Sequence, residues 1–126
     1  MEYANILGNH LNYTGLVMQQ NGKDTNRFHF GYGDGTQGYG PGAVQLTAGA
    51  WQHVAVVCDG EMAFCYINGE EKSTGSSKGM FAPNPSLTFR LGQGYGSGRF
   101  FRGLLSDVRI YRMALSPAEV QKVMKE

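Results

Sequence analysis

The sequence predicts an all-β sandwich that ends in a short helix, and three observations carry that prediction. Short segments alternate apolar and polar residues with the period of two that is typical of half-buried antiparallel strands. Glycine supplies 19 of the 126 residues, well above its usual share of roughly 7%, and so much glycine disfavours long helices. Only the C-terminal end carries a helix start signal. One compact domain over residues 1–126 is expected at this length.

The candidate strands precede residue 112. In chain order they are residues 3–7, 15–20, 27–32, 43–47, 53–58, 62–68, 86–91 and 104–111. In the third of them Phe28, Phe30 and Tyr32 share one face and His29 lies on the other. Asp59-Gly60 predicts a hairpin with a two-residue loop.

The helix is predicted from a capping sequence. Ser116-Pro117-Ala118-Glu119 combines an N-cap serine, a proline at the first helical position and a glutamate three residues after the cap. About two helical turns should follow. Val120, Val123 and Met124 would then face inward.

Charge and hydropathy exclude two classes of partner. Lys and Arg number 11 and Asp and Glu number 10, a net charge of +1, which argues against a large nucleic-acid footprint. No apolar run approaches the ~20 residues that span a bilayer. We therefore expect no nucleic-acid partner and no membrane insertion. The first residues also lack the features of a secretory signal peptide.

The two cysteines are expected to be free. With a two-residue loop at Asp59-Gly60, Cys58 would lie opposite Glu61 and Cys65 opposite Val54. The two sulfur atoms would then lie several residues apart along the ladder. A disulfide needs Cα atoms within about 7 Å, so two largely buried thiols are expected.

Three segments together resemble a known family. They are residues 51–60 (WQHVAVVCDG), 64–69 (FCYING) and 101–112 (FRGLLSDVRIYR), the last followed by 114–120 (ALSPAEV). In order and spacing they are similar to the concanavalin A-like lectin/glucanase superfamily, and more narrowly to its laminin G-like and pentraxin-like jelly-roll domains. The resemblance implies a concanavalin A-like jelly-roll sandwich of two antiparallel sheets with a short C-terminal helix. It also implies an extracellular or cell-surface protein.

Family members usually carry one or two further strands before the point where this chain starts. We expect either that the N-terminal strands are short and divergent or that the chain is a fragment of a larger protein. A missing strand would leave an open sheet edge, which is a template for pairing with another chain. A homodimer or strand exchange through that edge is therefore expected.

Two glycine-aromatic loops form the candidate binding surface. Sugar binding needs an aromatic face for the apolar side of the ring and planar polar groups for the hydroxyls. Glycine also lets the backbone approach a ligand closely. The alternative is that these tyrosines pack on the sandwich. The candidate ligand-binding residues are Tyr32, Asp34, Gln37 and Tyr39 in the first loop, and Gln93, Tyr95 and Arg99 in the second.

Asp107 lies inside the last predicted strand, where a charge costs free energy unless it is paired. The resemblance implies that a carboxylate here can help to ligate a structural calcium, which takes six to eight oxygen ligands. A salt bridge to Arg109 or Arg102 is the alternative. Residues 93–98, which correspond to the pentraxin-type calcium loop, contain no carboxylate. No cofactor is therefore expected to be required for ligand binding.

Catalysis is not expected. Glucanases of the superfamily carry acidic residues at alternate positions of one strand, so that one can act as nucleophile and another as general acid. Within the predicted strands none of the aspartates alternates with a glutamate: Asp24, Asp34, Asp59 and Asp107. We predict a non-catalytic binding module for carbohydrate. The alternatives are a protein-interaction or adhesion module and a structural accessory domain of a larger secreted protein.

Overall fold

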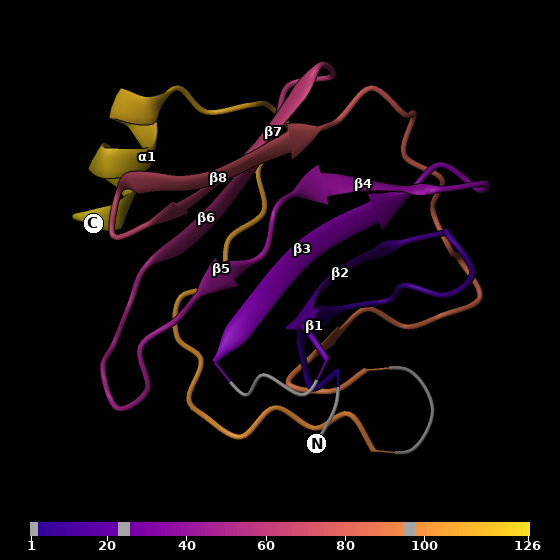
Figure 1. The fold of residues 1–126 in the computed structure, drawn as a ribbon, viewed down its shortest axis with the longest axis horizontal. Coiled ribbons are helices and arrows are strands. Elements are labelled where there is room, and N and C mark those ends of the chain that lie inside the picture. Colours follow the sequence, from indigo (N-terminus) through magenta and orange to yellow (C-terminus); the bar gives the residue numbers. More distant parts are fainter. Residues whose placement is uncertain (1–2, 23–25, 95–97) are drawn as a thin grey trace.

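The computed structural model describes residues 3–22, 26–94 and 98–126, and shows a mostly β chain with one short C-terminal helix (Figure 1). The strands are β1 (Asn5–Gly8), β2 (Leu16–Gln20), β3 (Arg27–Gly33), β4 (Gly38–Pro41), β5 (Val44–Gln45), β6 (Val54–Cys58), β7 (Met62–Ile67), β8 (Glu70–Ser76) and β9 (Arg90–Leu91). The helix α1 spans Pro117–Met124. No helix among the described residues is long and apolar enough to cross a membrane.

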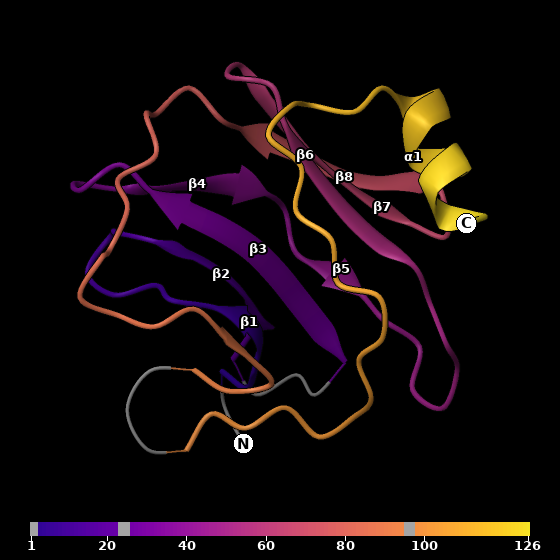
Figure 2. The ribbon, with the colours of Figure 1, turned by 180° about the vertical axis from the view of Figure 1, so that it is seen from behind.

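The strands form one curled antiparallel sheet with the order β6-β7-β8-β4-β3-β2-β1-β9, and β5 pairs with β3 off this path. The ribbon views show β1–β4 and β6–β8 as two inclined parts of this sheet (Figures 1 and 2). The predicted second sheet is not formed by the described residues. The predicted last strand, residues 104–111, has no strand beside it there, so its backbone joins no ladder.

The two parts of the sheet are joined where β4 pairs with β8. Gly40 lies opposite Ser76 and Pro41 opposite Gly75. A Cβ atom on Gly75 would clash with the carbonyl oxygen of Gly40, so the strands approach as closely as they do only because position 75 is glycine. The curl of the sheet therefore depends on residues without side chains.

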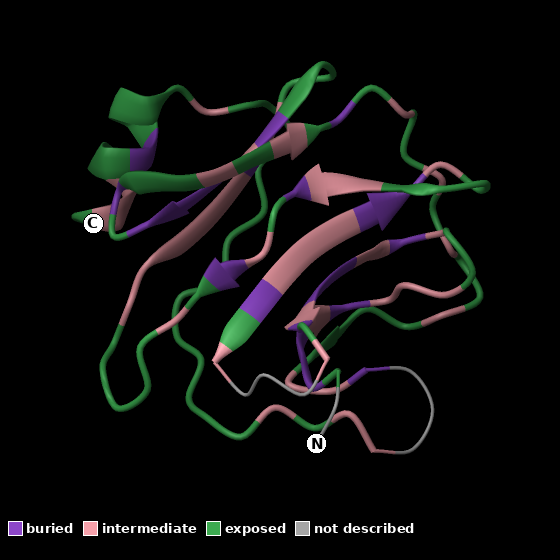
Figure 3. Ribbon diagram, viewed as in Figure 1, coloured by how far each residue is buried: buried purple, intermediate pink, exposed green. Residues whose placement is uncertain are grey.

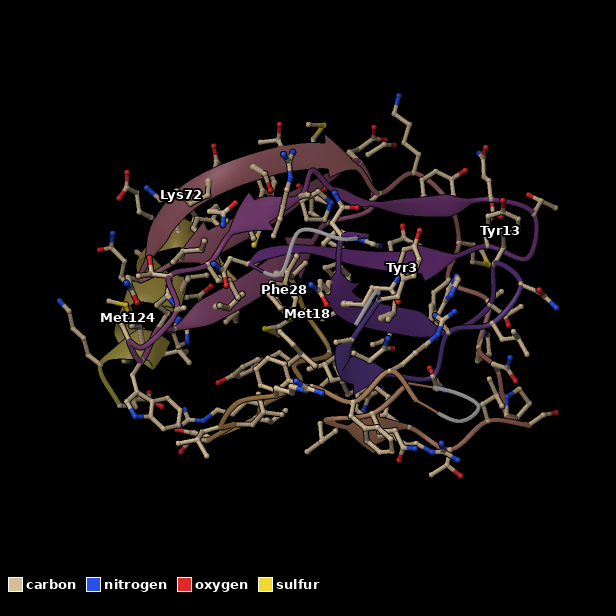
Figure 4. The ribbon with its side chains drawn as sticks, turned by 60° about the horizontal axis from the view of Figure 1, so that its bottom comes forward. Tyr3, Tyr13, Met18, Phe28, Lys72 and Met124 are labelled. Carbon is tan, nitrogen blue, oxygen red and sulfur yellow. The ribbon has the colours of Figure 1, made fainter. Side chains whose placement is uncertain are left out.

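The core lies on the concave face of the sheet. One cluster of buried side chains contains Ile6, Met18 and Phe28, and a second contains Val44, Cys65 and Ile67. Leu46 and Val54 pack against both clusters, so the two are continuous. Figure 4 shows Met18 and Phe28 between the sheet and the C-terminal part of the chain. Phe101 contacts Phe28 edge-on from that side, with ring centroids 6.3 Å apart.

The helix covers the opposite face of β6 and β7. Val120 is fully buried against Val57 and Tyr66, whereas Val123 and Met124 are half-buried, which confirms the predicted inward face (Figure 3). The capping box also forms as predicted. The Ser116 hydroxyl accepts a hydrogen bond from the Glu119 amide, and the Ser116 amide donates to the Glu119 carboxylate at 2.7 Å.

The hairpin between β6 and β7 has a longer loop than the sequence predicted. Cys58 pairs with Ala63, and Val56 pairs with Cys65, and three residues rather than two lie between the end of β6 and the start of β7. Asp59 explains the difference, because its Oδ1 accepts hydrogen bonds from the amides of both Glu61 and Met62. The aspartate thus stabilises a wider turn.

Both thiols are free, as expected. Burial raises the pKa of Cys58 and of Cys65 to about 11. Both side chains therefore stay protonated at neutral pH and act as small apolar groups in the packing.

The packing of α1 leads to a stability prediction. Val120→Ala removes two methyl groups from a site with no exposed surface, and we expect it to lower the free energy of unfolding by about 2 kcal/mol. Lys122→Ala, on the exposed side of the same helix, should change it by less than about 0.5 kcal/mol. Urea denaturation measures both. Equal effects of the two variants would contradict the docked position of the helix.

Candidate functional site

A hollow of about 430 Å³ lies on the convex face of β2, β3 and β4. Its position follows from strand register. Met18 pairs with Phe30 on the core side, so Gln19 and His29, one residue further along each strand, point to the other face. We call this site the outer hollow; the polar and aromatic side chains that line it include His10, Tyr13, Gln19, His29, Gln37 and Tyr39.

Glycine keeps the outer hollow open. Gly31, Gly38 and Gly40 line it and present only backbone. A Cβ atom on Gly40 would clash with the carbonyl oxygen of Phe30, and one on Gly31 would lie 3.3 Å from the carbonyl oxygen of Tyr39. Side chains at these positions would separate the strands or fill the space. The sequence pattern Gly-Tyr-Gly-Pro of β4 therefore creates both the strand pairing and the concavity.

Two of the predicted tyrosines take different roles. Tyr32 is buried, and its hydroxyl donates to the carbonyl oxygen of Gly79 at 2.8 Å. Its ring stacks on Tyr39 with centroids 5.7 Å apart. Tyr39 is half-buried, and its hydroxyl accepts a hydrogen bond from Gln37. The ring of Tyr32 thus packs against that of Tyr39, and Tyr39 and Gln37 both belong to the lining of the outer hollow.

Asp34 organises the loop that holds Gln37. Its Oδ1 accepts hydrogen bonds from the Gln37 amide and from the amide and hydroxyl of Thr36, at 2.8–2.9 Å. These bonds, that of the Gln37 amide first, lower the pKa of Asp34 to about 2. Because one carboxylate oxygen is used three times inside the turn, Asp34 fixes the loop and does not line the outer hollow.

The second predicted loop does not join the first. Gln93 pairs with Phe100 beside β9, at the far edge of the sheet from β4. Arg99 places its guanidinium 5.5 Å from the centroid of the Tyr3 ring. It is nevertheless close enough to His10 for its charge to lower the pKa of that residue. Tyr95 lies outside the described residues.

Sequence reasoning missed the two histidines. Burial lowers the pKa of His29, and the neighbouring His10 lowers it further. The pKa of His10 is lowered by burial and then by Arg99. Gln19 Nε2 lies 3.3 Å from His29 Nε2, while His29 Nδ1 is buried without a hydrogen-bond partner among the described residues. Both imidazoles are therefore neutral at pH 7 and offer one donor and one acceptor each.

Comparison with known proteins places the chain in a family. A laminin G-type family model, described as the concanavalin A-like lectin/glucanases superfamily, matches residues 3–121. The chain belongs to this superfamily. A crystal structure of an S-layer domain-containing protein from Clostridium thermocellum is also similar, with a TM-score of 0.49 and 20% sequence identity. That match covers 98% of this chain and 63% of the other, so this chain spans less than two thirds of the solved one.

The calcium that the superfamily resemblance implied at Asp107 does not fit the described residues. Both carboxylate oxygens accept hydrogen bonds from the Arg109 guanidinium, at 2.8 and 2.9 Å. Arg109 also pairs with Glu126. Residues 3–22, 26–94 and 98–126 contain no group of three metal-ligating side chains, whereas calcium takes six to eight oxygen ligands. The geometry shows the alternative that the sequence offered, a salt bridge to Arg109.

The histidines generate a prediction for pH dependence. The pKa of His10, His29 and His53 is lowered from 6.5 in each case, chiefly by burial. The unfolded chain therefore binds more protons than the folded chain below pH 6.5, and stability must fall as the pH falls through that value. We expect a lower urea midpoint at pH 5.5 than at pH 7.5.

The substitution His29→Gln tests the origin of that effect. It keeps a polar side chain but removes one titrating group, so the midpoint should depend less on pH than in the unmodified chain. A midpoint that rises on acidification would show that the histidines are instead stabilised in their charged form.

Proposed function

We propose that the domain is a non-catalytic carbohydrate-binding module that holds a sugar in the outer hollow without calcium. The observation that supports this function is that Tyr39, Gln37, Gln19 and two neutral imidazoles all belong to the lining of one glycine-lined concavity. Its volume of about 430 Å³ lies at the small end of the roughly 300–1,000 Å³ of small-molecule sites. A short glycan segment is the ligand of matching size.

The chemistry of these side chains suits a sugar. An aromatic ring such as Tyr39 offers an apolar face to the C–H side of a pyranose, while its hydroxyl and the Gln37 amide reach the ring substituents. Gln19, His10 and His29 supply donors and acceptors without net charge, which matches neutral hydroxyls. A single glycan should bind weakly, and repetition would supply avidity.

The same lining supports binding without hydrolysis. Glycosidases of the usual kind place two carboxyl groups about 5–10 Å apart across the scissile bond. The described lining of the outer hollow contains neither Asp nor Glu. Asp34 and Asp59 hold turns, where hydrogen bonds from backbone amides lower the pKa of each. We therefore propose no catalytic role and, from the family resemblance, an extracellular or cell-surface location.

A protein-interaction or adhesion module is the second candidate. It is favoured by a different observation, the exposed apolar side chains of residues 104–113 on the other side of the sheet. The two functions are compatible, because they use opposite faces of the same sheet.

A glycan panel, probed once with calcium and once with chelator, tests the proposed function. We expect the same glycans to bind in both conditions. Tyr39→Ala removes the aromatic face, and Gln37→Ala removes an amide, so each should weaken binding of a panel hit by about tenfold, the effect of roughly 1.4 kcal/mol. Titration calorimetry measures the affinities.

Gln45→Ala is the matched control, since Gln45 is an exposed glutamine on β5 that does not line the outer hollow. Its affinity should equal that of the unmodified chain. Binding that survives both Tyr39→Ala and Gln37→Ala would place the sugar elsewhere. Binding lost only with chelator would restore a calcium site, and a folded chain that binds no glycan would favour the protein-interaction function.

A further inference from the structure

Residues 102–113 form an exposed segment that crosses the concave side of the sheet without joining it (Figure 2). Their backbone makes no hydrogen bond with the backbone of any described residue. Leu104, Ile110 and Met113 leave 75%, 72% and 72% of their surface exposed. A segment whose backbone groups pair with no strand and whose apolar side chains are exposed is a template for strand pairing.

The space next to this segment is also apolar. A groove of about 1,220 Å³ separates it from the sheet and is bordered by core side chains such as Phe28, Val54 and Phe101. Trp51, 67% exposed, stands at its border. Exposed apolar surface of this extent on one side of a small domain marks an interaction site.

We propose that a second copy of this chain covers the segment, and that the two copies pair as antiparallel strands centred on Val108. In this register Val108 faces the partner's Val108, and Asp107 faces the partner's Arg109. By symmetry Arg109 faces the partner's Asp107, so the interface is isologous. Leu105 faces the partner's Tyr111, an apolar–aromatic cross-strand pair of the stabilising kind.

Charge selects this register over its neighbours. A pair centred on residue 107 would put Asp107 opposite the partner's Asp107. A pair centred on residue 109 would put Arg109 opposite the partner's Arg109. Like charges directly opposite each other destabilise a sheet, whereas opposite charges contribute roughly 0.2–1 kcal/mol per pair. Only the register centred on Val108 places opposite charges together twice. The segment is thus complementary to itself, which identifies the occupant as a second copy.

The present contacts of the segment are compatible with pairing. Asp107 has a φ of 54°, a left-handed conformation that aspartate tolerates, so it can become extended at modest cost. Arg109 contacts both Asp107 and Glu126. Its five N–H donors allow it to keep Glu126 while it reaches the partner's Asp107. These contacts are exposed, so little buried structure must be lost.

A charge-swap experiment with the full chain tests the register. Light scattering should find a dimer at high protein concentration. Asp107→Arg puts arginine opposite arginine, and Arg109→Asp puts aspartate opposite aspartate, so each variant alone should weaken the dimer at least tenfold. An equimolar mixture should restore it, because the two variants are complementary. Circular dichroism confirms that each variant is folded.

Cysteine cross-linking provides a second measurement that does not depend on charge. Val108→Cys should give a disulfide-linked dimer under mild oxidation, because directly opposite Cα atoms lie about 4.5–5.5 Å apart. Ser106→Cys is the matched control. Its two copies would lie four residues apart along the strands, about 14 Å, and should not cross-link.

A chain that remains a monomer at all concentrations overturns the proposal. So does dimerisation of the single charge variants with unchanged affinity, or equal cross-linking through residues 106 and 108. None of these results bears on the sugar site, because no residue of the outer hollow is changed.

Discussion

The pairing of β4 with β8 is the interaction on which the rest of the structure depends. It joins the two parts of the sheet through only two opposed pairs, Gly40 with Ser76 and Pro41 with Gly75. The resulting curl lets Leu46 and Val54 pack against both core clusters. The same short strand carries Tyr39 and the glycines that keep the outer hollow open. Fold and candidate site are therefore set by one four-residue segment with little side-chain volume.

That strand is also one of two strands that the sequence did not predict, and the other is its partner β8. Strands β2, β3, β6 and β7 show regular alternation or β-branched residues, and the sequence predicted each of them within a few residues. Gly-Tyr-Gly-Pro has low intrinsic strand propensity, and its neighbours β3 and β8 impose its conformation. The opposite error occurred at residues 104–111, where the alternation is present but no neighbouring strand exists among the described residues. A strand forms only where a neighbouring strand is available for hydrogen bonding, whatever the alternation in its sequence.

The candidate site was predictable to a similar degree. Composition identified the loop with Gln37 and Tyr39, which does border the outer hollow, but it could not separate Tyr39 from the buried Tyr32. The tertiary structure is needed to show that the Tyr32 ring is buried and the Tyr39 ring is half-buried. The sequence placed His29 on the face of its strand opposite Phe28 and Phe30, yet its meeting with Gln19 depends on the register of β2 against β3. Register is a tertiary property, so residue types alone did not reveal this pair.

The outer hollow and the segment of residues 102–113 lie on opposite faces of the sheet, so each can be used without blocking the other. As the proposed sugar site, the outer hollow is small and lined by uncharged hydrogen-bonding groups, so it would hold a single glycan weakly. Pairing through residues 102–113 uses the concave side and leaves both hollows of a dimer open. Two linked sites convert the second binding event into an intramolecular one, which raises avidity without any new sugar contact. Self-association would thus compensate for the low affinity that the geometry of one hollow implies.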